Sequence, residues 1–350
     1  MSHSPPSPAI EPKQFPDAPP MLRGYWYTAC ASSRLAKEPR GVRVLDQDLV
    51  VFRDGAGQPR ALLDRCCHRG VRLSLGSVNG GNIACRYHGW CFDGEGRCVH
   101  IPSLTKDRRI PDKVGVPSFP CEERDGYVWV FLGEGAPPPL EGIPRFASHR
   151  WLQGAVDMRC DYLKMIENNV DWCHPYFAHP WSHYQFFATR FRGFQEYEYE
   201  MRITERGILV FTPATSDAEA PVPPDAFRAS FELPNRVTVE TTKFTAPIII
   251  LHFVPTGENC CRLEWMVKSP IPFGPKVGWS KREPNIFAQD RVLLESAQPW
   301  YDRGGGSFEK SVEADASTLL VRRVVELAAR GAWESTRASL PKRRLVGIRA

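Results

Sequence analysis

Short runs of hydrophobic residues, separated by turn signals, occupy the first third of the chain. The clearest runs cover residues 42–45, 49–53, 60–63 and 127–132. Glycine-containing sequences such as Asp54-Gly55 and Asn79-Gly80-Gly81 lie between them and are typical of tight turns. Because no long segment with a helical period occurs between residues 25 and 132, the pattern predicts a small all-β domain.

A different pattern begins after a proline- and glycine-rich loop at residues 133–144. Leu163, Ile166, Val170 and Cys173 recur every three or four residues, which predicts a helix over residues 161–173 that ends or kinks at Pro175. Further runs predict strands at 197–204, 208–212, 236–241, 248–254 and 262–267, and helices at 284–297 and 315–329. We therefore expect an α+β second domain, an antiparallel sheet flanked by helices.

The expected division is a disordered tail at residues 1–20, which hold seven prolines, an all-β domain at 21–140 and a second domain at 141–350. Hydrophobic residues make up 42% of the chain, charged residues 24%, and the net charge is +5. These values are typical of a globular protein and do not indicate nucleic-acid binding. No apolar run approaches the length of a membrane span, and no signal-peptide pattern opens the chain.

Cysteine usage changes this picture. The eleven cysteines are an odd number, and two pairs are sequence neighbours, Cys66-Cys67 and Cys260-Cys261. A disulfide framework does not suit this arrangement, and a chain of this size does not need one. We expect a reducing compartment, by default the cytoplasm, and thiolates committed to a metal.

Two Cys/His motifs lie in the predicted all-β region. Cys66 and His68 form a Cys-x-His pair, and after sixteen intervening residues Cys85 and His88 form a Cys-x2-His pair. Thiolates suit iron–sulfur clusters, and in a Rieske centre two histidines replace two cysteines on one iron. A structural zinc site uses the same ligand types, but usually with both cysteines on one loop and both histidines on a helix. The mixed pairs therefore favour a [2Fe–2S] cluster.

A second constellation follows, made of Asn168, Asp171, His174 and His179. Asp171 and His174 share a helix face, so the carboxylate is expected to accept the imidazole N–H. Pro175 disrupts the backbone between the two histidines, which lets them converge on one ion. Two histidines and a carboxylate form the facial triad of non-haem Fe(II) oxygenases. Alone, such a pair of histidines is more often packed than metal-bound, but the upstream motif reverses these odds.

Together, the two constellations resemble the oxygenase component of Rieske non-haem iron oxygenases. The resemblance implies that Cys66 and Cys85 bind one cluster iron and that His68 and His88 bind the other. It also implies a helix-grip catalytic domain of the START/Bet v 1 type after the Rieske domain.

The second constellation fills every fixed position of the family pattern Asn-x2-Asp-x2-His-x4-His, which makes Asn168 and Asp171 the expected catalytic positions. The family takes the third iron ligand from a C-terminal helix. The segment PNIFAQDRVLLESAQ resembles that helix and places Asp290 at the matching position. The alternative carboxylates are Glu167, Glu283 and Glu295.

The resemblance further implies a homotrimer in which the cluster of one subunit lies beside the iron of its neighbour. Asp171 would then bridge His174 of its own subunit to His88 of the next. Since the chain has no GxGxxG motif, electrons from NAD(P)H are expected through a separate ferredoxin or flavin reductase. Four arginines lie near the cluster motifs: Arg65, Arg69, Arg72 and Arg86. They are expected to dock an acidic ferredoxin or reductase. The alternatives are that they are solvated loop charges or contact the neighbouring subunit.

The predicted substrate pocket is lined by Phe186, Phe187, Ile248, Ile250 and His252. Such a lining favours a small aromatic or alicyclic molecule. The chain length resembles that of the trimeric monooxygenases and demethylases, so we expect C–H hydroxylation or oxidative demethylation with O2. The alternatives are a cis-dihydroxylating dioxygenase and a Rieske electron-transfer protein without oxygenase chemistry.

Overall fold

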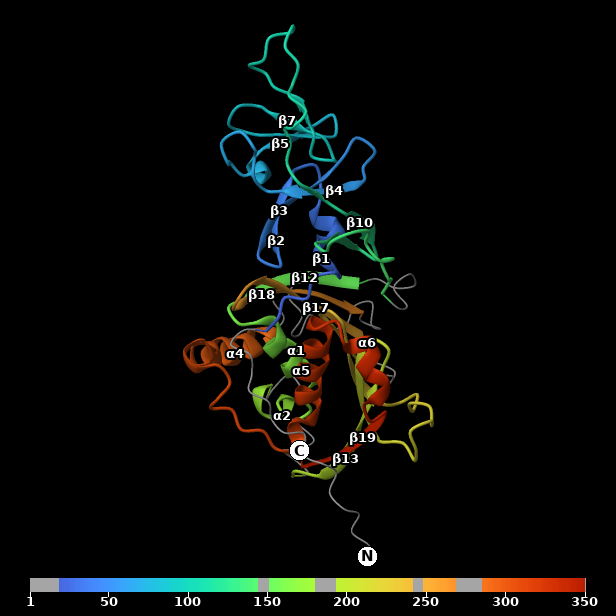
Figure 1. Cartoon of the computed structure of the whole chain (residues 1–350). Coiled ribbons are helices and arrows are strands. Elements are labelled where there is room, and N and C mark those ends of the chain that lie inside the picture. Colours follow the sequence, from blue (N-terminus) through green and yellow to red (C-terminus); the bar gives the residue numbers. More distant parts are fainter. Residues whose placement is uncertain (1–18, 144–150, 180–192, 242–247, 269–284, 350) are drawn as a thin grey trace, which may run out of the picture.

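The computed structural model of the chain describes residues 19–143, 151–179, 193–241, 248–268 and 285–349. Figure 1 shows an elongated molecule with an all-β region at one end and a large sheet with helices at the other. Most of the predicted proline-rich tail lies outside the described residues. None of the helices in the described ranges is long and apolar enough to cross a membrane.

The N-terminal region is built from three small antiparallel sheets, ordered β1-β11-β10, β2-β3-β4-β9 and β5-β6-β7-β8. This confirms the predicted all-β fold. The strands are β1 (Trp26–Ala31), β2 (Arg40–Val44), β3 (Gln47–Arg53), β4 (Pro59–Leu63), β5 (Ser77–Asn79), β6 (Asn82–Ala84), β7 (Cys91–Phe92), β8 (Cys98–His100), β9 (Ser118–Phe119), β10 (Cys121–Arg124) and β11 (Tyr127–Phe131).

The C-terminal region contains one eight-stranded antiparallel sheet with the order β12-β18-β17-β16-β15-β14-β13-β19. Its strands are β12 (Trp151–Met158), β13 (Glu196–Ile203), β14 (Gly207–Thr212), β15 (Phe227–Glu232), β16 (Arg236–Thr241), β17 (Ile248–Gly257), β18 (Cys260–Lys268) and β19 (Arg343–Arg349). The helices are α1 (Tyr162–Val170), α2 (Pro175–Ala178), α4 (Asn285–Gly304), α5 (Ala316–Ala329) and α6 (Trp333–Thr336). The predicted α+β class is confirmed, although α4 extends past its predicted end at residue 297.

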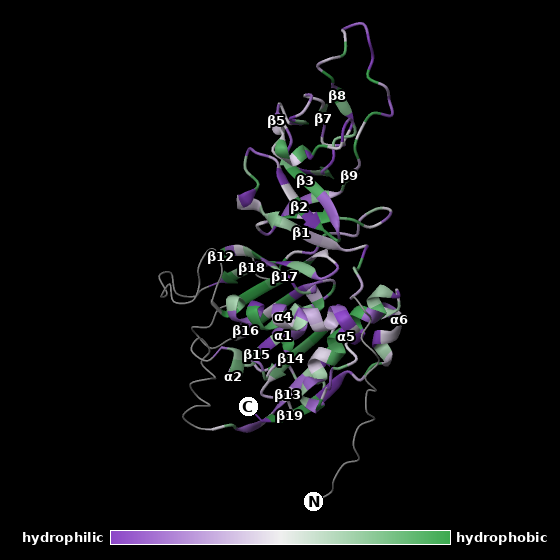
Figure 2. Cartoon of the chain, turned by 90° about the vertical axis from the view of Figure 1, so that its left-hand side faces the viewer, coloured by the Kyte–Doolittle hydropathy of each residue, from purple (hydrophilic) through white to green (hydrophobic). Residues whose placement is uncertain are grey.

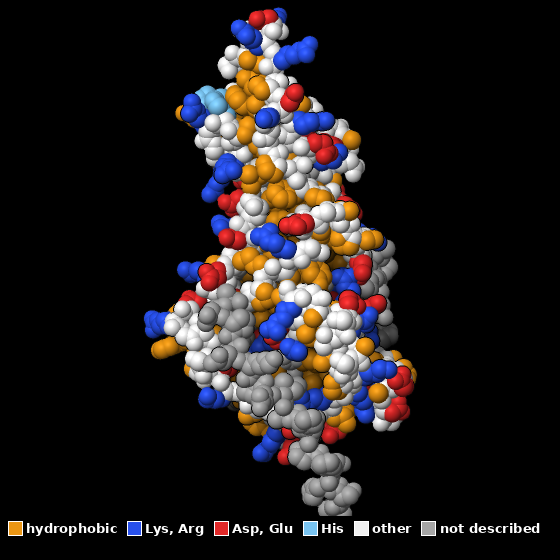
Figure 3. All heavy atoms as spheres, viewed as in Figure 1, with side chains coloured by type: hydrophobic (Ala, Val, Ile, Leu, Met, Phe, Trp, Pro, Cys, Tyr) orange, Lys and Arg blue, Asp and Glu red, His pale blue; other side chains and the backbone are white. Residues whose placement is uncertain are grey.

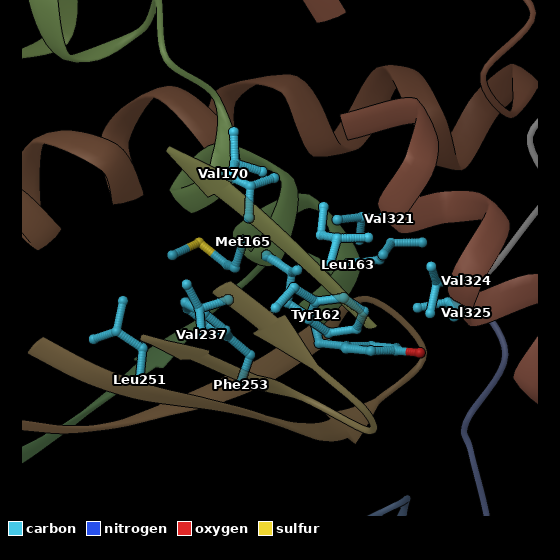
Figure 4. Packing of buried hydrophobic residues seen from close by; sticks show 14 of the residues in the cluster. Tyr162, Leu163, Met165, Val170, Val237, Leu251, Phe253, Val321, Val324 and Val325 are labelled. Atoms are coloured by element: carbon cyan, nitrogen blue, oxygen red, sulfur yellow. The ribbon is translucent and has the colours of Figure 1, made fainter. Parts of the chain in front are cut away.

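The main core lies between this sheet and helices α1 and α5. Figure 4 shows Leu163 and Met165 of α1 between Val325 of α5 and the strand residues Leu251 and Phe253. In Figure 2 the strands β17 and β18 are predominantly hydrophobic. One face of the sheet is therefore buried against α1 and holds this helix in place. Helix α1 leads into the predicted iron-binding residues.

The opposite face of β17 packs against the N-terminal domain. Side chains of a strand alternate between its two faces, so Ile248, Ile250 and His252 point away from the helices. Ile250 lies in a buried cluster with Trp129, and the His252 ring meets the Trp129 ring edge-on at 5.1 Å. The prediction that Ile248, Ile250 and His252 line the substrate pocket is therefore wrong. The run is hydrophobic on both faces, so its pattern did not indicate which residues face the helices.

A two-residue turn also joins the domains. Val44 pairs with Gln47, which leaves Leu45 and Asp46 as the turn, with φ angles of 50° and 62°. A positive φ is unusual for leucine. The Leu45 side chain is buried, and its amide donates a hydrogen bond of 2.8 Å to the carbonyl of Pro255 on β17. The contact between domains thus holds Leu45 in this conformation.

Residues before β1 lie on the C-terminal domain. Leu22 belongs to the same core cluster as α1 and α5. The Tyr162 hydroxyl donates a hydrogen bond of 2.7 Å to the carbonyl of Pro20, and the Tyr27 hydroxyl donates one of 2.7 Å to that of Leu22. This segment therefore ties the start of the N-terminal domain to α1.

Glu264 predicts a pH dependence of this domain packing. It is 1% exposed, and it lies opposite His252 in the antiparallel pairing of β17 with β18. Burial, opposed by the charges of Arg262, Arg34 and Arg40, raises its pKa from 4.5 to about 7. Between these values the unfolded chain loses the proton while the folded chain keeps it, so the contribution of Glu264 to the free energy of unfolding should fall as pH rises through this window.

The Glu264→Gln variant removes this titration without changing the side-chain size. As pH rises across the same window, we expect the melting temperature of the wild type to fall relative to that of the variant, measured by differential scanning calorimetry. Parallel declines in the two proteins would show that Glu264 does not keep its proton in the folded state.

Candidate metal centres

Two loops of the N-terminal domain present Cys66 and Cys85 with the same backbone hydrogen-bond pattern. In each loop the cysteine carbonyl accepts a bond of 2.9 Å from the amide of a glycine four residues later, Gly70 or Gly89. The cysteine amide donates to the carbonyl five residues later, at 2.9 Å in the first loop and 2.8 Å in the second. Both glycines have positive φ, 74° and 70°, which favours glycine. The Cys-x-His and Cys-x2-His motifs thus form matched loops.

The four predicted cluster ligands converge between these loops. Both cysteines are buried, and burial together with the neighbouring Cys85 raises the pKa of the Cys66 thiol to about 11. The rings of His68 and His88 lie 4.6 Å apart, and His68 Nδ1 is buried without a hydrogen-bond partner among the described residues. An unpartnered ring nitrogen beside two thiols fits a metal ligand.

The geometry favours a two-iron cluster over zinc. Ligand atoms of one tetrahedral zinc ion lie close to one another. Within the described ranges, no three of these four residues bring one ligand atom each to within 4.8 Å of one another. The residues therefore fit a group larger than a single ion.

A second group lies in the C-terminal domain, where α1, α2 and α4 meet. The ligand atoms of His174, His179 and Asp290 all lie within 4.8 Å of one another. Asp290 Oδ1 is 3.3 Å from His179 Nε2 and 3.8 Å from His174 Nε2. Asp290 is 3% exposed and His179 4% exposed. A buried carboxylate that faces two imidazole nitrogens is the donor set of a non-haem iron site.

Hydrogen bonds to the other ring nitrogens orient both histidines. His174 Nδ1 lies 3.1 Å from the carbonyl of Asp171, and His179 Nδ1 lies 2.9 Å from Gln289 Oε1. Because both partners are acceptors, each Nδ1 carries the proton. Each Nε2 therefore carries no proton and lies on the side of Asp290.

The electrostatics of this group also fit a cation. Burial lowers the pKa of His174, against the charge of Asp290, and so favours the neutral ligand form. For His179, burial acts to lower the pKa, but the interaction with the nearby Asp290 carboxylate outweighs it and raises the pKa. Asp290 Oδ1 has no hydrogen-bond partner within the part of the chain that the structure describes. A divalent ion would satisfy this oxygen.

A local turn brings the two histidines together. Asp171 caps the end of α1, and its carboxylate accepts a hydrogen bond of 2.7 Å from the Cys173 amide. Pro175 then begins α2, which places His174 just before this short helix and His179 just after it. The expectation that the Asp171 carboxylate accepts the His174 ring N–H is wrong, because the backbone carbonyl of Asp171 takes that place.

Comparison with known proteins agrees with this architecture. The family model of the Rieske [2Fe-2S] domain matches residues 25–120. Chlorophyllide a oxygenase of Chlamydomonas reinhardtii is 30% identical over 86% of this chain and 47% of its own length. The oxygenase subunit of 3-chlorobenzoate-3,4-dioxygenase of Comamonas testosteroni is 27% identical over 81% of this chain and 68% of its own.

A crystal structure of dicamba monooxygenase bound to dicamba has the same fold, with a TM-score of 0.72 at 22% identity over 88% of this chain and 98% of that one. The chain therefore contains a Rieske [2Fe-2S] domain and is similar to oxygenases along most of its length. It spans about half the length of several curated relatives that it matches.

Among the carboxylates considered as the third ligand of the second metal centre, the structure brings Asp290 to the two histidines. Glu167 instead pairs with Arg322, at 2.5 Å, and Glu295 accepts a bond of 2.9 Å from the Arg159 amide. Other predicted positions lie outside the described residues: Glu283, Phe186 and Phe187. Asn168 Nδ2 lies 3.4 Å from His174 Nε2, beside the group.

Sequence reasoning missed Gln289. This residue precedes Asp290 on α4, and its side chain accepts from the ring of His179. The only sign of this role in the sequence was that a glutamine adjoins Asp290. Whether this glutamine reaches His179 depends on how α4 packs against α2. No spacing rule along the sequence contains that information.

Replacement of Gln289 tests the orientation of His179. In the Gln289→Leu variant, His179 loses the acceptor that fixes its tautomer, so the affinity for Fe(II) should fall by about 10–100-fold. Gln289→Glu keeps an acceptor oxygen and should retain most of the affinity. The measurement is titration of Fe(II) into iron-free protein; equal affinities of wild type and Gln289→Leu would exclude this role.

Proposed function

We propose that the chain is the oxygenase component of a Rieske-type enzyme, which uses O2 and two externally supplied electrons to monooxygenate a small aromatic or alicyclic molecule. The reaction is C–H hydroxylation or oxidative demethylation. The observation that carries the proposal is that one chain contains both the Rieske domain and the group of His174, His179 and Asp290. An electron carrier would need only the Rieske domain.

The proposed division of roles follows from the two donor sets. When bound, the [2Fe–2S] cluster supplies single electrons and the mononuclear iron supplies O2 activation. Cys66, Cys85, His68 and His88 hold the cluster in this proposal. His174, His179 and Asp290 would hold the mononuclear iron, and three protein ligands would leave coordination positions for small molecules.

The placement of the two groups supports electron transfer between subunits. Figures 1 and 2 show β5 and β7, which flank the cluster loops, at the end of the molecule far from α1 and α2. Since electrons must pass between the two centres, we infer a homotrimer in which the cluster of one subunit faces the iron site of its neighbour. His88 is exposed at this end, and Asp171 is the proposed bridge on the receiving subunit.

The proposed electron source is a separate ferredoxin or flavin reductase that draws on NAD(P)H. One relative bears the name of an oxygenase subunit, which implies further components of that enzyme. Figure 3 shows Lys and Arg side chains at the cluster end of the molecule. Arg65, Arg69, Arg72 and Arg86 are all exposed there and suit an acidic partner, with contact to the neighbouring subunit as the alternative.

Ring cis-dihydroxylation is the second candidate reaction. The similarity to the 3-chlorobenzoate-3,4-dioxygenase subunit favours this reaction. The fold similarity to dicamba monooxygenase agrees with the first candidate, monooxygenation. The two reactions share the iron ligands and differ in how the substrate is held. A screen of aromatic and alicyclic compounds with a surrogate reductase and isotopically labelled O2 separates them, because the product mass shows whether one or two labelled atoms enter.

Metal content tests the iron site directly. Two irons in the cluster and one at the second site give an expected content of about three irons per chain, against about two for an electron carrier. The Asp290→Asn variant should lose the mononuclear iron and product formation but keep the visible spectrum of the cluster. Glu295→Gln, on the same helix, is the matched control and should keep all of the iron.

Iron and spectra are measured by elemental analysis and absorption spectroscopy. A wild-type protein with zinc at either centre, or an Asp290→Asn protein with full iron and normal turnover, would contradict the proposal.

Asp171 tests the path between the centres. The Asp171→Asn variant keeps an oxygen that can accept from the Cys173 amide, so the turn and both metal sites should remain intact. Loss of the carboxylate charge should nearly abolish product formation and slow the oxidation of the reduced cluster by O2 in the presence of substrate. Stopped-flow absorption measures this rate; unchanged oxidation and turnover would remove Asp171 from the electron path.

A further inference from the structure

Helix α5 supplies none of the proposed metal ligands, but it holds the last turn of α1 (Figure 1). Arg322 of α5 donates two hydrogen bonds to the Glu167 carboxylate, from Nε to Oε1 at 2.5 Å and from Nη2 to Oε2 at 2.7 Å. The Ser317 hydroxyl of the same helix donates one of 3.0 Å to the carbonyl of Val170. The end of α1 is therefore held by directed polar contacts as well as by apolar packing.

Glu167 is connected directly to the turn that carries His174. Its backbone carbonyl accepts a hydrogen bond of 3.0 Å from the Asp171 amide, and the Asp171 carbonyl in turn orients the His174 ring. The next residue, Asn168, lies beside His174 Nε2. Glu167 itself is 7% exposed. A shift of Glu167 along the helix axis would therefore displace His174.

The same guanidinium group reaches the connection between α4 and α5. Arg322 Nη1 donates to Glu309 Oε2 at 2.8 Å, and Nη2 donates to Glu309 Oε1 at 2.6 Å. Glu309 lies in the segment that follows α4, which ends at Gly304. Arg322 thus bridges one carboxylate on α1 and another beyond the end of α4. These are the two regions of the chain that supply the proposed iron ligands.

Helices α1 and α4 are antiparallel. At one end of their contact, Asp290 faces the two histidines that follow α1. At the other end, the amide of Asp161, the N-cap of α1, donates a hydrogen bond of 3.0 Å to Gln298 Oε1, and Lys164 Nζ lies 3.7 Å from the centre of the Tyr301 ring. Because a slip of one residue moves a helix by about 1.5 Å along its axis, the register of α4 on α1 decides whether its carboxylate reaches the histidines.

We propose that Arg322 is a positioning residue of the mononuclear iron site. Its planar guanidinium presents donors in a fixed fork, so the two carboxylate pairs set the direction as well as the distance between α1 and the end of α4. Apolar packing stabilises the same helices but is non-directional. The Arg322 bridge thereby holds Asp290 at the spacing from His174 and His179 that one ion requires. This inference rests on the iron site of the proposed function.

The Arg322→Lys variant tests the directed geometry. Lysine keeps a positive charge between Glu167 and Glu309, so the protein should fold, but an ammonium group cannot form the two forks. In protein that retains its cluster and lacks the mononuclear iron, the affinity for Fe(II) should fall by about tenfold, the lower end of the effect of losing a group that orients metal ligands. Isothermal titration calorimetry measures this affinity. The electron paramagnetic resonance spectrum of the Fe(II)–nitric oxide complex should change as well, because it reports the arrangement of the ligands.

Removal of the whole bridge separates positioning from stability. Replacing Arg322 alone by an apolar residue would leave two carboxylates without a counter-charge, which is destabilising, whereas replacing all members of a buried ion network is often neutral or stabilising. The variant Glu167→Leu/Glu309→Leu/Arg322→Met should therefore melt close to the wild-type temperature. We expect its Fe(II) affinity to remain about tenfold below that of the wild type, since apolar contacts do not restore the register.

Arg323→Lys is the matched control. Arg323 adjoins Arg322 on α5 and forms a partly exposed ion pair of 2.9 Å with Glu326 of the same helix. Because such pairs contribute little, the control should keep the wild-type Fe(II) affinity within about twofold.

Equal Fe(II) affinity and identical spectra in the wild type and Arg322→Lys would overturn the proposal. It would also be overturned if the triple variant regained the wild-type affinity together with the wild-type melting temperature, because the bridge would then act through stability alone. Failure of the wild type itself to bind Fe(II) at this site would contradict the proposed function and remove the inference with it.

Discussion

The packing of the N-terminal domain on the outer face of the eight-stranded sheet determines where the two metal centres lie. Trp26, Trp129 and Phe131 bury their rings against Ile250 and Met266 of the central strands. The other face of the same strands holds α1 and, through its C-terminal turn, the histidine pair. One layer of strands therefore separates the two domains, and the cluster loops lie at the far end of the N-terminal domain (Figure 1). In this arrangement the two proposed centres of one chain lie far apart, and the proposed electron path therefore uses a neighbouring subunit.

Within the C-terminal domain, the geometry of the proposed iron site depends on hydrogen bonds to its histidines as much as on the ligands themselves. The Asp171 carboxylate forms the turn after α1, and the Asp171 carbonyl orients His174. Gln289 does the same for His179 and adjoins Asp290 on α4. The three ligands come from two regions more than a hundred residues apart in the sequence, and both regions rest on the same sheet. The stability of the core and the geometry of the site are thus linked.

The sequence was most informative where chemistry requires particular residue types at short spacing. Cys66, His68, Cys85 and His88 indicated the cluster because the residue types and their spacing carry the information. Asp290 was found only through resemblance, since its partners are distant in the sequence. The sequence did not indicate which side chains of β17 face the helices and which face the N-terminal domain. Both faces of Ile248–Val254 are largely apolar, and only the packing of the N-terminal domain distinguishes one face from the other. The Leu45-Asp46 turn was likewise hidden, because its positive φ angles are held by a contact with Pro255 rather than by glycine or asparagine.

The most direct test of electron transfer between subunits is a complementation experiment. One variant loses the cluster by replacement of Cys85 and His88 with alanine, and the other loses the mononuclear iron by replacement of His174 and His179. Each alone should be inactive. After subunits are mixed and reassembled in equal amounts, an intact cluster faces an intact iron site at about one quarter of the interfaces of a cyclic trimer, so product formation should return to about a quarter of the wild-type rate. If the reassembled mixture is as inactive as its components, electrons do not cross between subunits and the account is wrong.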